Sequence, residues 1–137
     1  MLEVSAAILE QDGKILICQR SASKSCGLLW EFPGGKKEPH ETIAQSLVRE
    51  CQEELGITIC KPVFFADVIL PDKNLHLNFF KTAIQSGCLT RKEHAAFAWI
   101  SPDEIGQYTF CPSDQQMLAT VSLNALFQPY SSCQDKD

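Results

Sequence analysis

Residues 42–56 constrain the fold more than any other segment, because they predict an amphipathic helix with both ends marked. Thr42 and Gln45, three positions apart, fit a capping box at the helix N-terminus. Gly56 is the residue type at which helices commonly end, so the helix should run to about residue 55. Its apolar positions span about 140° of the helix circumference, which predicts a core-facing stripe. They are Ile43, Ala44, Leu47, Val48, Cys51 and Leu55.

Three glutamates lie beside this apolar stripe. Glu50, Glu53 and Glu54 occupy an arc about 100° wide at the edge of the buried face, where the wall of a cleft would lie. Like charges at these offsets repel by roughly a few tenths of a kcal/mol per pair. The stretch 48–57 contains no lysine to offset them. Either a solvated face tolerates the repulsion, or a cation belongs beside these carboxylates.

The remaining segments predict a layered domain in which helices pack on a sheet. Alternating or apolar runs predict strands over 2–10, 14–20, 61–70, 75–84 and 94–100. Residues 21–30, 30–41 and 71–74 are predicted to be loops, residues 101–108 a short helical turn, and residues 113–127 the last helix. Ser113 or Asp114 is expected near the N-cap of that helix. The predicted fold class is α/β or α+β, with a single domain over 1–130 and a polar tail over 131–137.

Composition narrows the function classes. The net charge of -5 argues against binding to nucleic acid polymers or anionic membranes, although a metal could still attract a small anionic substrate. No apolar run approaches the length of a membrane span, and the acidic residue at position 3 argues against a signal peptide. The seven cysteines form no C-x-x-C pair and are predicted to be reduced thiols. We therefore expect a cytoplasmic protein.

The loop and the helix together carry one extended motif. The chain matches G-x5-E-x7-R-E-U-x-E-E-x-G-U, where U is apolar, from Gly35 to Ile57. Its seven fixed residues would match by chance on the order of once in 10^8 registers. This motif resembles the box of the Nudix family of diphosphate hydrolases, and "LWEFPGGK" before it is similar to the MutT and CTP pyrophosphohydrolase branch. The segments "ILICQR", "EHAAFAWISPDEI" and "FCPSD" extend the resemblance to most of the chain.

The resemblance implies a Nudix-like α/β/α sandwich with a mixed central sheet and two main helices. It also implies a magnesium site, with Mn²⁺ able to substitute, because a hard cation takes oxygen ligands and bridges carboxylates to phosphates. Glu50, Glu53, Glu54, the Gly34 carbonyl and Glu93 would be the metal ligands. Either Glu50 or Glu93 would be the base that activates water.

Other residues receive roles from the same resemblance. Arg49 would orient the carboxylates, and Glu41 would tune the loop or an outer metal. Arg20 would contact substrate phosphate, although an arginine after a strand is equally compatible with a simple surface position. Phe32 or its apolar neighbours would face the nucleobase. Glu93 could also be a solvated loop acid, and His94 is predicted to be a loop histidine.

Asp114 bears on the choice of base. An ionised carboxylate only accepts hydrogen bonds, which suits the N4 amino group of cytosine, but guanine-type bases also present N–H donors. Asp114 could equally be a helix N-cap without any base contact.

The function implied is hydrolysis of a nucleoside triphosphate to monophosphate and pyrophosphate, on cytidine nucleotides such as CTP, dCTP and modified forms. One alternative is an 8-oxo-dGTP diphosphatase. The other is a Nudix sensor that binds a nucleotide without cleaving it. The expected partner is a small-molecule nucleotide, and the protein is expected to be a monomer or homodimer.

Overall fold

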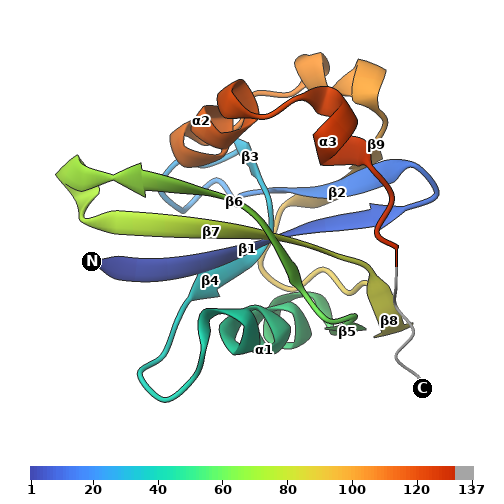
Figure 1. The fold of residues 1–137 in the computed structure, drawn as a ribbon. Coiled ribbons are helices and arrows are strands. Elements are labelled where there is room, and N and C mark those ends of the chain that lie inside the picture. The colour runs from blue at the N-terminus through green and yellow to red at the C-terminus, as the bar shows by residue number, and fades with distance from the viewer. Residues whose placement is uncertain (132–137) are drawn as a thin grey trace.

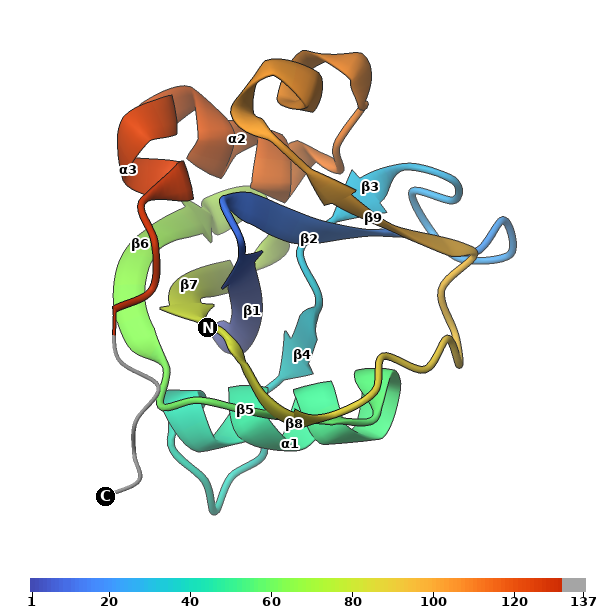
Figure 2. The same cartoon turned by 90° about the vertical axis from the view of Figure 1, so that its right-hand side faces the viewer.

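The computed structural model describes residues 1–131 and has three layers. Figure 1 shows helix α1 (Ile43–Leu55) on one face of the sheet and helices α2 (Pro112–Thr120) and α3 (Leu123–Phe127) on the other. The view in Figure 2, turned by 90°, shows the same order of layers. The predicted α/β/α sandwich is therefore confirmed. None of the helices within residues 1–131 combines the length and apolar character needed to cross a bilayer.

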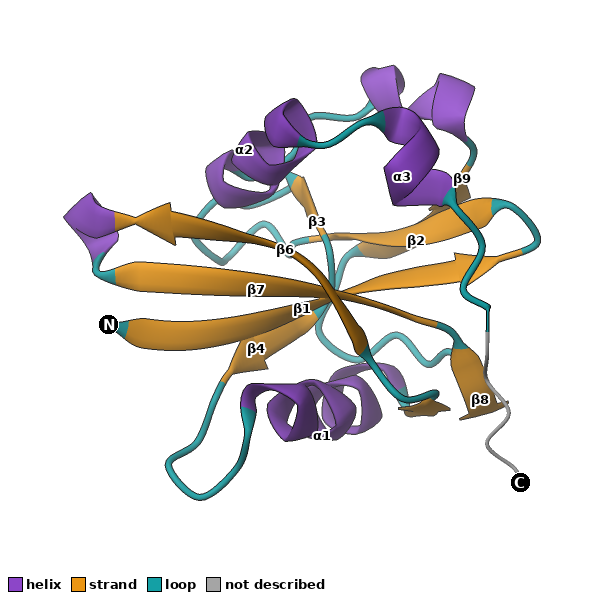
Figure 3. Cartoon of the chain, in the orientation of Figure 1, coloured by secondary structure: helices purple, strands orange, loops and turns teal. Residues whose placement is uncertain are grey.

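The central sheet is mixed, with the strand order β3-β2-β1-β7-β6. Strands β1 and β7 pair in parallel, whereas the other pairs in this sheet are antiparallel. Strand β4 also pairs with β1, β9 pairs with β2, and β5 and β8 form a small separate sheet. Figure 3 distinguishes these strands from the loops that join them. Their bounds are β1 Leu2–Gln11, β2 Lys14–Gln19, β3 Trp30–Glu31, β4 Gly34–Lys36, β5 Ile57–Ile59, β6 Val63–Leu70, β7 Leu75–Thr82, β8 Ile84–Gly87 and β9 Ala96–Ile100.

Strand β1 is buried on both faces, which explains its nearly continuous apolar sequence. Successive side chains of a strand point to opposite faces. Ala6 and Ile8 pack in the core beneath α2 and α3, whereas Ala7 and Leu9 pack in the core beneath α1. Each fully buried aliphatic side chain contributes roughly 1.5–3 kcal/mol. The two cores together hold the sandwich around β1.

Both ends of α1 form as predicted. The Thr42 side chain accepts a hydrogen bond from the Gln45 N–H (3.1 Å), and the Gln45 side chain accepts one from the Thr42 N–H (2.8 Å), which completes the capping box. Gly56 ends the helix with a φ of 73°, a left-handed conformation that glycine adopts without steric cost. In the first turn of the helix, the buried Ser46 hydroxyl hydrogen-bonds to the Ser5 hydroxyl on β1 (3.1 Å). The helix is therefore fixed in register against the strand.

Several details differ from the predictions. The loop predicted over 30–41 contains the short strands β3 and β4, because its residues pair with β2 and β1. The last helix breaks after Thr120, where the backbone becomes extended at Val121 and Ser122 starts α3. The short helix η1 (Pro71–Lys73) lies in a predicted loop, and strand β5 lies in a stretch for which no element was predicted.

Two further predictions concern the cysteines and the tail. Five cysteines are free thiols, namely Cys18, Cys26, Cys51, Cys88 and Cys111. Cys60 is disulfide-bonded, so the prediction that every cysteine is reduced is wrong there. The predicted tail over 131–137 lies outside the described residues apart from residue 131, and it stays a prediction.

The contact between β4 and β1 should be intolerant of a side chain at Gly34. A Cβ at Gly34 would lie 1.9 Å from the Ser5 carbonyl oxygen, whereas one at Gly106 would meet nothing within 4 Å. We expect Gly34→Ala to lower the free energy of unfolding by about 2 kcal/mol or more, because the two backbones must separate. The matched control Gly106→Ala should change it by less than about 0.5 kcal/mol. Urea denaturation measures both, and equal midpoints would contradict the close approach.

Candidate functional site

The three motif glutamates on α1 do not lie in equivalent surroundings. The Glu50 side chain is only 14% exposed and that of Glu53 is 60% exposed. Burial raises the pKa of Glu50. Burial, and next the charge of Glu50, raise the pKa of Glu54 to about 8, and the two carboxyl groups hydrogen-bond to each other. The structure therefore brings Glu50 and Glu54 together and leaves Glu53 at the rim.

Arg49 fixes the surroundings of this carboxyl pair. Its guanidinium donates to both carboxylate oxygens of Glu41 (3.0 and 2.7 Å), to Glu50 (3.2 Å) and to Glu53 (3.1 Å). It also donates to the carbonyl of Lys36 on β4 (3.0 Å). A planar fork that meets several oxygens in this way holds them in fixed directions. The contacts expected between Arg49 and the carboxylates are present.

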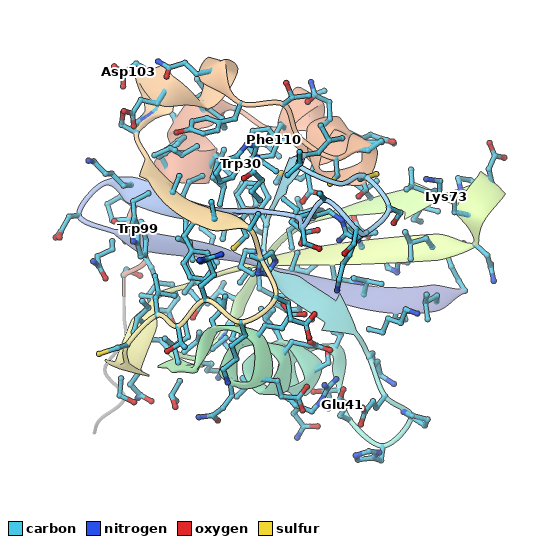
Figure 4. The ribbon with its side chains drawn as sticks, turned by 180° about the vertical axis from the view of Figure 1, so that it is seen from behind. Trp30, Glu41, Lys73, Trp99, Asp103 and Phe110 are labelled. Atoms are coloured by element: carbon cyan, nitrogen blue, oxygen red, sulfur yellow. The ribbon has the colours of Figure 1, made fainter. Side chains whose placement is uncertain are left out.

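Glu41 orders the loop before α1, where Figure 4 labels it. Besides Arg49, its carboxylate accepts a hydrogen bond from the Glu38 N–H (2.9 Å). The Arg49 guanidinium, followed by the Glu38 N–H, holds the pKa of Glu41 at about 2. Its contacts agree with the loop-tuning role that was expected.

The two glycines of β4 bring the backbone against both β1 and α1. A Cβ at Gly35 would lie 2.3 Å from the Glu50 carboxyl carbon, so only glycine leaves room for that carboxylate. Gly34 precedes it and lines the neighbouring cavity. The loop backbone and the buried carboxyl pair therefore share one wall.

These residues fit a divalent cation only in part. Glu50 and Glu54 are hard oxygen donors, and burial raises the pKa of both carboxyl groups. Arg49 offsets this rise in part at Glu50, whereas the charges that act on Glu54 are those of other carboxylates. However, within residues 1–131 no three His, Cys, Asp or Glu side chains gather in an arrangement that could hold a metal ion. Glu53 is turned toward Arg49 instead. Glu50 and Glu54 form the core of a cation site, and further ligands would require side chains to move.

A cavity of about 240 Å³ lies beside Gly34. Arg20, Phe32 and Asp114, the three predicted substrate-binding residues, all line it. They come from three separate parts of the chain. Backbone hydrogen bonds from Trp30 N–H to the Thr109 carbonyl (2.9 Å) and from Cys111 N–H to the Trp30 carbonyl (2.8 Å) bring these parts together. Figure 4 shows the neighbouring Trp30 and Phe110 side by side at this junction.

Phe32 is a core residue that also lines the cavity. Its ring stacks on Phe110 (5.8 Å between centroids) and meets Phe79 edge-on (6.1 Å). The residue is 3% exposed. An open ring surface for a nucleobase is therefore not available at Phe32 in this conformation.

Asp114 is a buried acid at the floor of the substrate region. It is 4% exposed, and its Oδ1 accepts a hydrogen bond from the Phe32 N–H (3.1 Å). Burial raises its pKa to about 7, although the bond from Phe32 partly opposes that shift. The N-cap of α2 is Cys111, and Ser113 and Asp114 lie in the first turn, near the N-cap as predicted. The alternative that Asp114 is itself the N-cap is wrong.

Glu31 and His94 are residues of this region that the sequence reasoning missed. Glu31 binds Arg20 (2.9 Å) and His94 (3.1 Å), and it also lines the cavity. His94 lies in a loop, as predicted, but it is buried, with 8% of its surface exposed. The signal for Glu31 was its place between Trp30 and Phe32, because strand alternation turns it away from both aromatic rings.

Glu93 lies on an exposed loop. Its side chain is 60% exposed and pairs with Lys24 (2.9 Å), which lowers its pKa. Its charge nevertheless contributes to the raised pKa of Glu54. Glu93 is thus near the carboxyl pair without joining it, and its role as ligand or base stays a prediction.

The buried Asp114 should make stability depend on pH. Its pKa is raised in the folded protein, so between about pH 4 and pH 7 the folded state binds a proton that the unfolded state releases, and stability falls as the pH rises through this window. Asp114→Asn cannot titrate, so its unfolding free energy relative to the wild type should increase by up to about 4 kcal/mol between pH 4 and pH 8.

Urea denaturation across this pH range measures the difference. The control Asp12→Asn, in the exposed turn between β1 and β2, measures the effect on stability of replacing a surface carboxylate by an amide. A difference for Asp114→Asn that does not change with pH would show that Asp114 keeps its ordinary pKa.

Comparisons with known proteins agree with this geometry. A model of the NUDIX domain matches residues 4–120. The chain is 44% identical over 128 residues to the CTP pyrophosphohydrolase of Escherichia coli strain K12, covering 91% of this chain and 95% of that protein. It is 36% identical over 95 residues to the 8-oxo-dGTP diphosphatase of Proteus vulgaris, covering 67% and 85%.

A solved structure of MutT, from work on the proteins of Aliivibrio salmonicida and Vibrio cholerae, superimposes with a TM-score of 0.72. It is 28% identical and covers 88% of this chain and 98% of that one. The matched family model includes β1, the α1 motif and α2, so the similarity extends over the carboxyl pair and the cavity alike. The chain therefore belongs to the Nudix family, in its MutT-like branch.

Proposed function

We propose that the protein hydrolyses a nucleoside triphosphate to the monophosphate and pyrophosphate, with cytidine nucleotides (CTP, dCTP and modified forms) among its substrates. One observation carries the proposal. A single cavity is lined by Arg20 and Asp114 at one part and by Gly34 at another, and Gly34 adjoins the backbone that packs on the Glu50 carboxylate. A nucleotide in this cavity would place its phosphates toward the carboxyl pair. The similarity to a CTP pyrophosphohydrolase supports the same reading.

The proposed cofactor is Mg²⁺, with Mn²⁺ able to substitute. Glu50 and Glu54 would hold the ion, and the Gly34 carbonyl would add a ligand. Glu53 and Glu93 could join only after leaving Arg49 and Lys24, to which they are paired. Such an ion, when bound, supplies the positive charge that neutralises phosphate oxygens as the anhydride bond breaks.

The side chains of the chain itself would position the reactants. Arg49 holds the carboxylates in place through its hydrogen bonds, and Arg20 would stabilise a phosphate group at the cavity wall. Glu50 or Glu93 would accept a proton from the water that attacks the β-phosphorus. Splitting a phosphoanhydride depends mainly on such positioning and charge stabilisation.

The protonation of Asp114 supports a second candidate function. A carboxyl group with a pKa of about 7 carries a proton part of the time at neutral pH. In that form it donates as well as accepts, as an amide does, so the argument that it only accepts from cytosine N4 weakens. Oxidised purine triphosphates such as 8-oxo-dGTP are therefore the second candidate substrate class, in line with the similarity to an 8-oxo-dGTP diphosphatase.

The remaining expectations belong to the same proposal. The protein would act on small nucleotides in the cytoplasm, as a monomer or homodimer, without binding nucleic acid polymers or membranes. A sensor that binds nucleotides without cleaving them has less support, because such a protein would not require the buried carboxyl pair.

Glu54→Gln should nearly abolish turnover while the fold survives. The substitution keeps the shape but removes a charged ligand, and we expect kcat to fall by more than about 100-fold, since even indirect partners of metal sites typically cost 10–100-fold. Stability at pH 7 should not decrease, because burial already disfavours the ionised Glu54. The control Glu104→Gln keeps the capping box of the short helix η2 (Pro102–Gln107) and should retain activity. Wild-type rates for Glu54→Gln would remove the helix-metal model.

A panel of nucleotides separates the two candidate functions. Hydrolysis in the presence of Mg²⁺ is measured as pyrophosphate release for CTP, dCTP, 5-methyl-dCTP, dGTP and 8-oxo-dGTP, and as AMP formation for ADP-ribose. We expect the highest kcat/KM on cytidine nucleotides. A clear preference for 8-oxo-dGTP would assign the protein to the second candidate. Nucleotide binding without hydrolysis of any of the six compounds would support the sensor.

A further inference from the structure

Glu31 on β3 contacts both Arg20 and His94, which are far apart in the sequence. Its Oε1 accepts a hydrogen bond from Arg20 Nη1 (2.9 Å), and its Oε2 lies 3.1 Å from His94 Nε2. The Glu31 side chain is 19% exposed and that of Arg20 is 24% exposed, so this ion pair is partly shielded from water. One carboxylate therefore supplies one acceptor oxygen to each of two partners.

These contacts set the direction of Arg20. Its Nε donates to the Ser25 carbonyl (2.7 Å), and its Nη1 is taken by Glu31. Both Arg20 and Ser25 line the cavity. A planar guanidinium held at two nitrogens has little rotational freedom left, and its remaining N–H groups keep a fixed direction. An arginine oriented in this way needs no reordering when an anion binds.

His94 extends the same contact to a second loop. It is buried, its Nδ1 has no hydrogen-bond partner among residues 1–131, and its Nε2 faces the Glu31 carboxylate. Because a carboxylate only accepts, Nε2 must carry the proton. The backbone around His94 is tied as well: Arg91 donates to the His94 carbonyl (3.3 Å), and the Ala95 N–H donates to the Gln19 carbonyl (2.8 Å).

The loop after Arg20 and the loop that contains His94 also contact each other at the protein surface. Glu93, next to His94, pairs with Lys24 in the loop that follows Arg20. The charge of Glu31 is also felt at both Asp114 and Glu54, since it contributes to the raised pKa of each. Glu31 thus lies within electrostatic range of both Asp114 and Glu54.

We propose that Glu31 and His94 are positioning residues: Glu31 orients Arg20 for the substrate phosphate and, through His94, holds the loop of Glu93 beside the cavity. This inference rests on the proposed function and adds two residues to it. Neither residue needs to touch the reacting atoms. Both act through groups that would.

A double-mutant cycle tests the link between Glu31 and Arg20. Glutamine at position 31 has one acceptor oxygen and cannot serve both partners. We expect Glu31→Gln to lower kcat/KM for CTP by about 10–100-fold, with the same division between kcat and KM as Arg20→Ala. The kcat/KM of the double variant should be within about threefold of that of the less active single variant, because the two substitutions remove the same interaction. Multiplicative losses would overturn the proposal, and Asp12→Asn should behave as the wild type.

A matched pair of variants tests His94. His94→Gln keeps an N–H donor for Glu31, whereas His94→Phe keeps a ring that can pack near Phe97, which lies 6.0 Å from the imidazole centroid. We expect His94→Gln to retain most of kcat/KM and His94→Phe to lose about 10-fold or more at unchanged thermal stability. The reverse order would show that His94 acts only by packing.

The design separates this inference from the proposed function. If the wild type releases no pyrophosphate from any nucleotide, the proposed function fails, and the same cycle is then measured on the equilibrium binding of CTP by calorimetry. Coupled losses in binding would support the role of Glu31. Independent losses would overturn it, and no CTP binding by the wild type would overturn both ideas.

Discussion

The site depends on the close approach of the β4 backbone, at Gly34 and Gly35, to two neighbours. On one side, the β4 backbone lies against the Ser5 carbonyl of β1, and on the other it lies against the Glu50 carboxylate of α1. Neither contact leaves room for a Cβ atom. Strand β1 contributes side chains to both hydrophobic cores. The contacts of β4 therefore position the carboxyl pair against a strand that is buried on both faces.

The carboxylates around Gly34 and Gly35 are not equally compensated by positive charge. Arg49 compensates Glu41, Glu50 and Glu53, whereas Glu54 lies deeper and is left with a raised pKa. A buried carboxyl of this kind costs stability unless a cation accompanies it. The fold thus keeps an energetically unfavourable arrangement beside a cavity, which is typical of functional sites.

The sequence predicts the parts that local chemistry determines. The capping box at Thr42, the stop at Gly56 and most strand positions follow from neighbouring residues, and the motif identified the α1 glutamates. The sequence could not show which carboxylates converge, because the burial of Glu54 arises from tertiary packing. Glu31 and His94 were missed for the same reason, since their contact joins residues 63 positions apart.

The most direct test of the account identifies the bond that is broken. CTP is incubated with the protein and Mg²⁺ in water enriched in ¹⁸O, and the products are followed by ³¹P NMR. The account predicts CMP and pyrophosphate, with the label in pyrophosphate because water attacks the β-phosphorus. Orthophosphate together with CDP, or label in CMP, would contradict it.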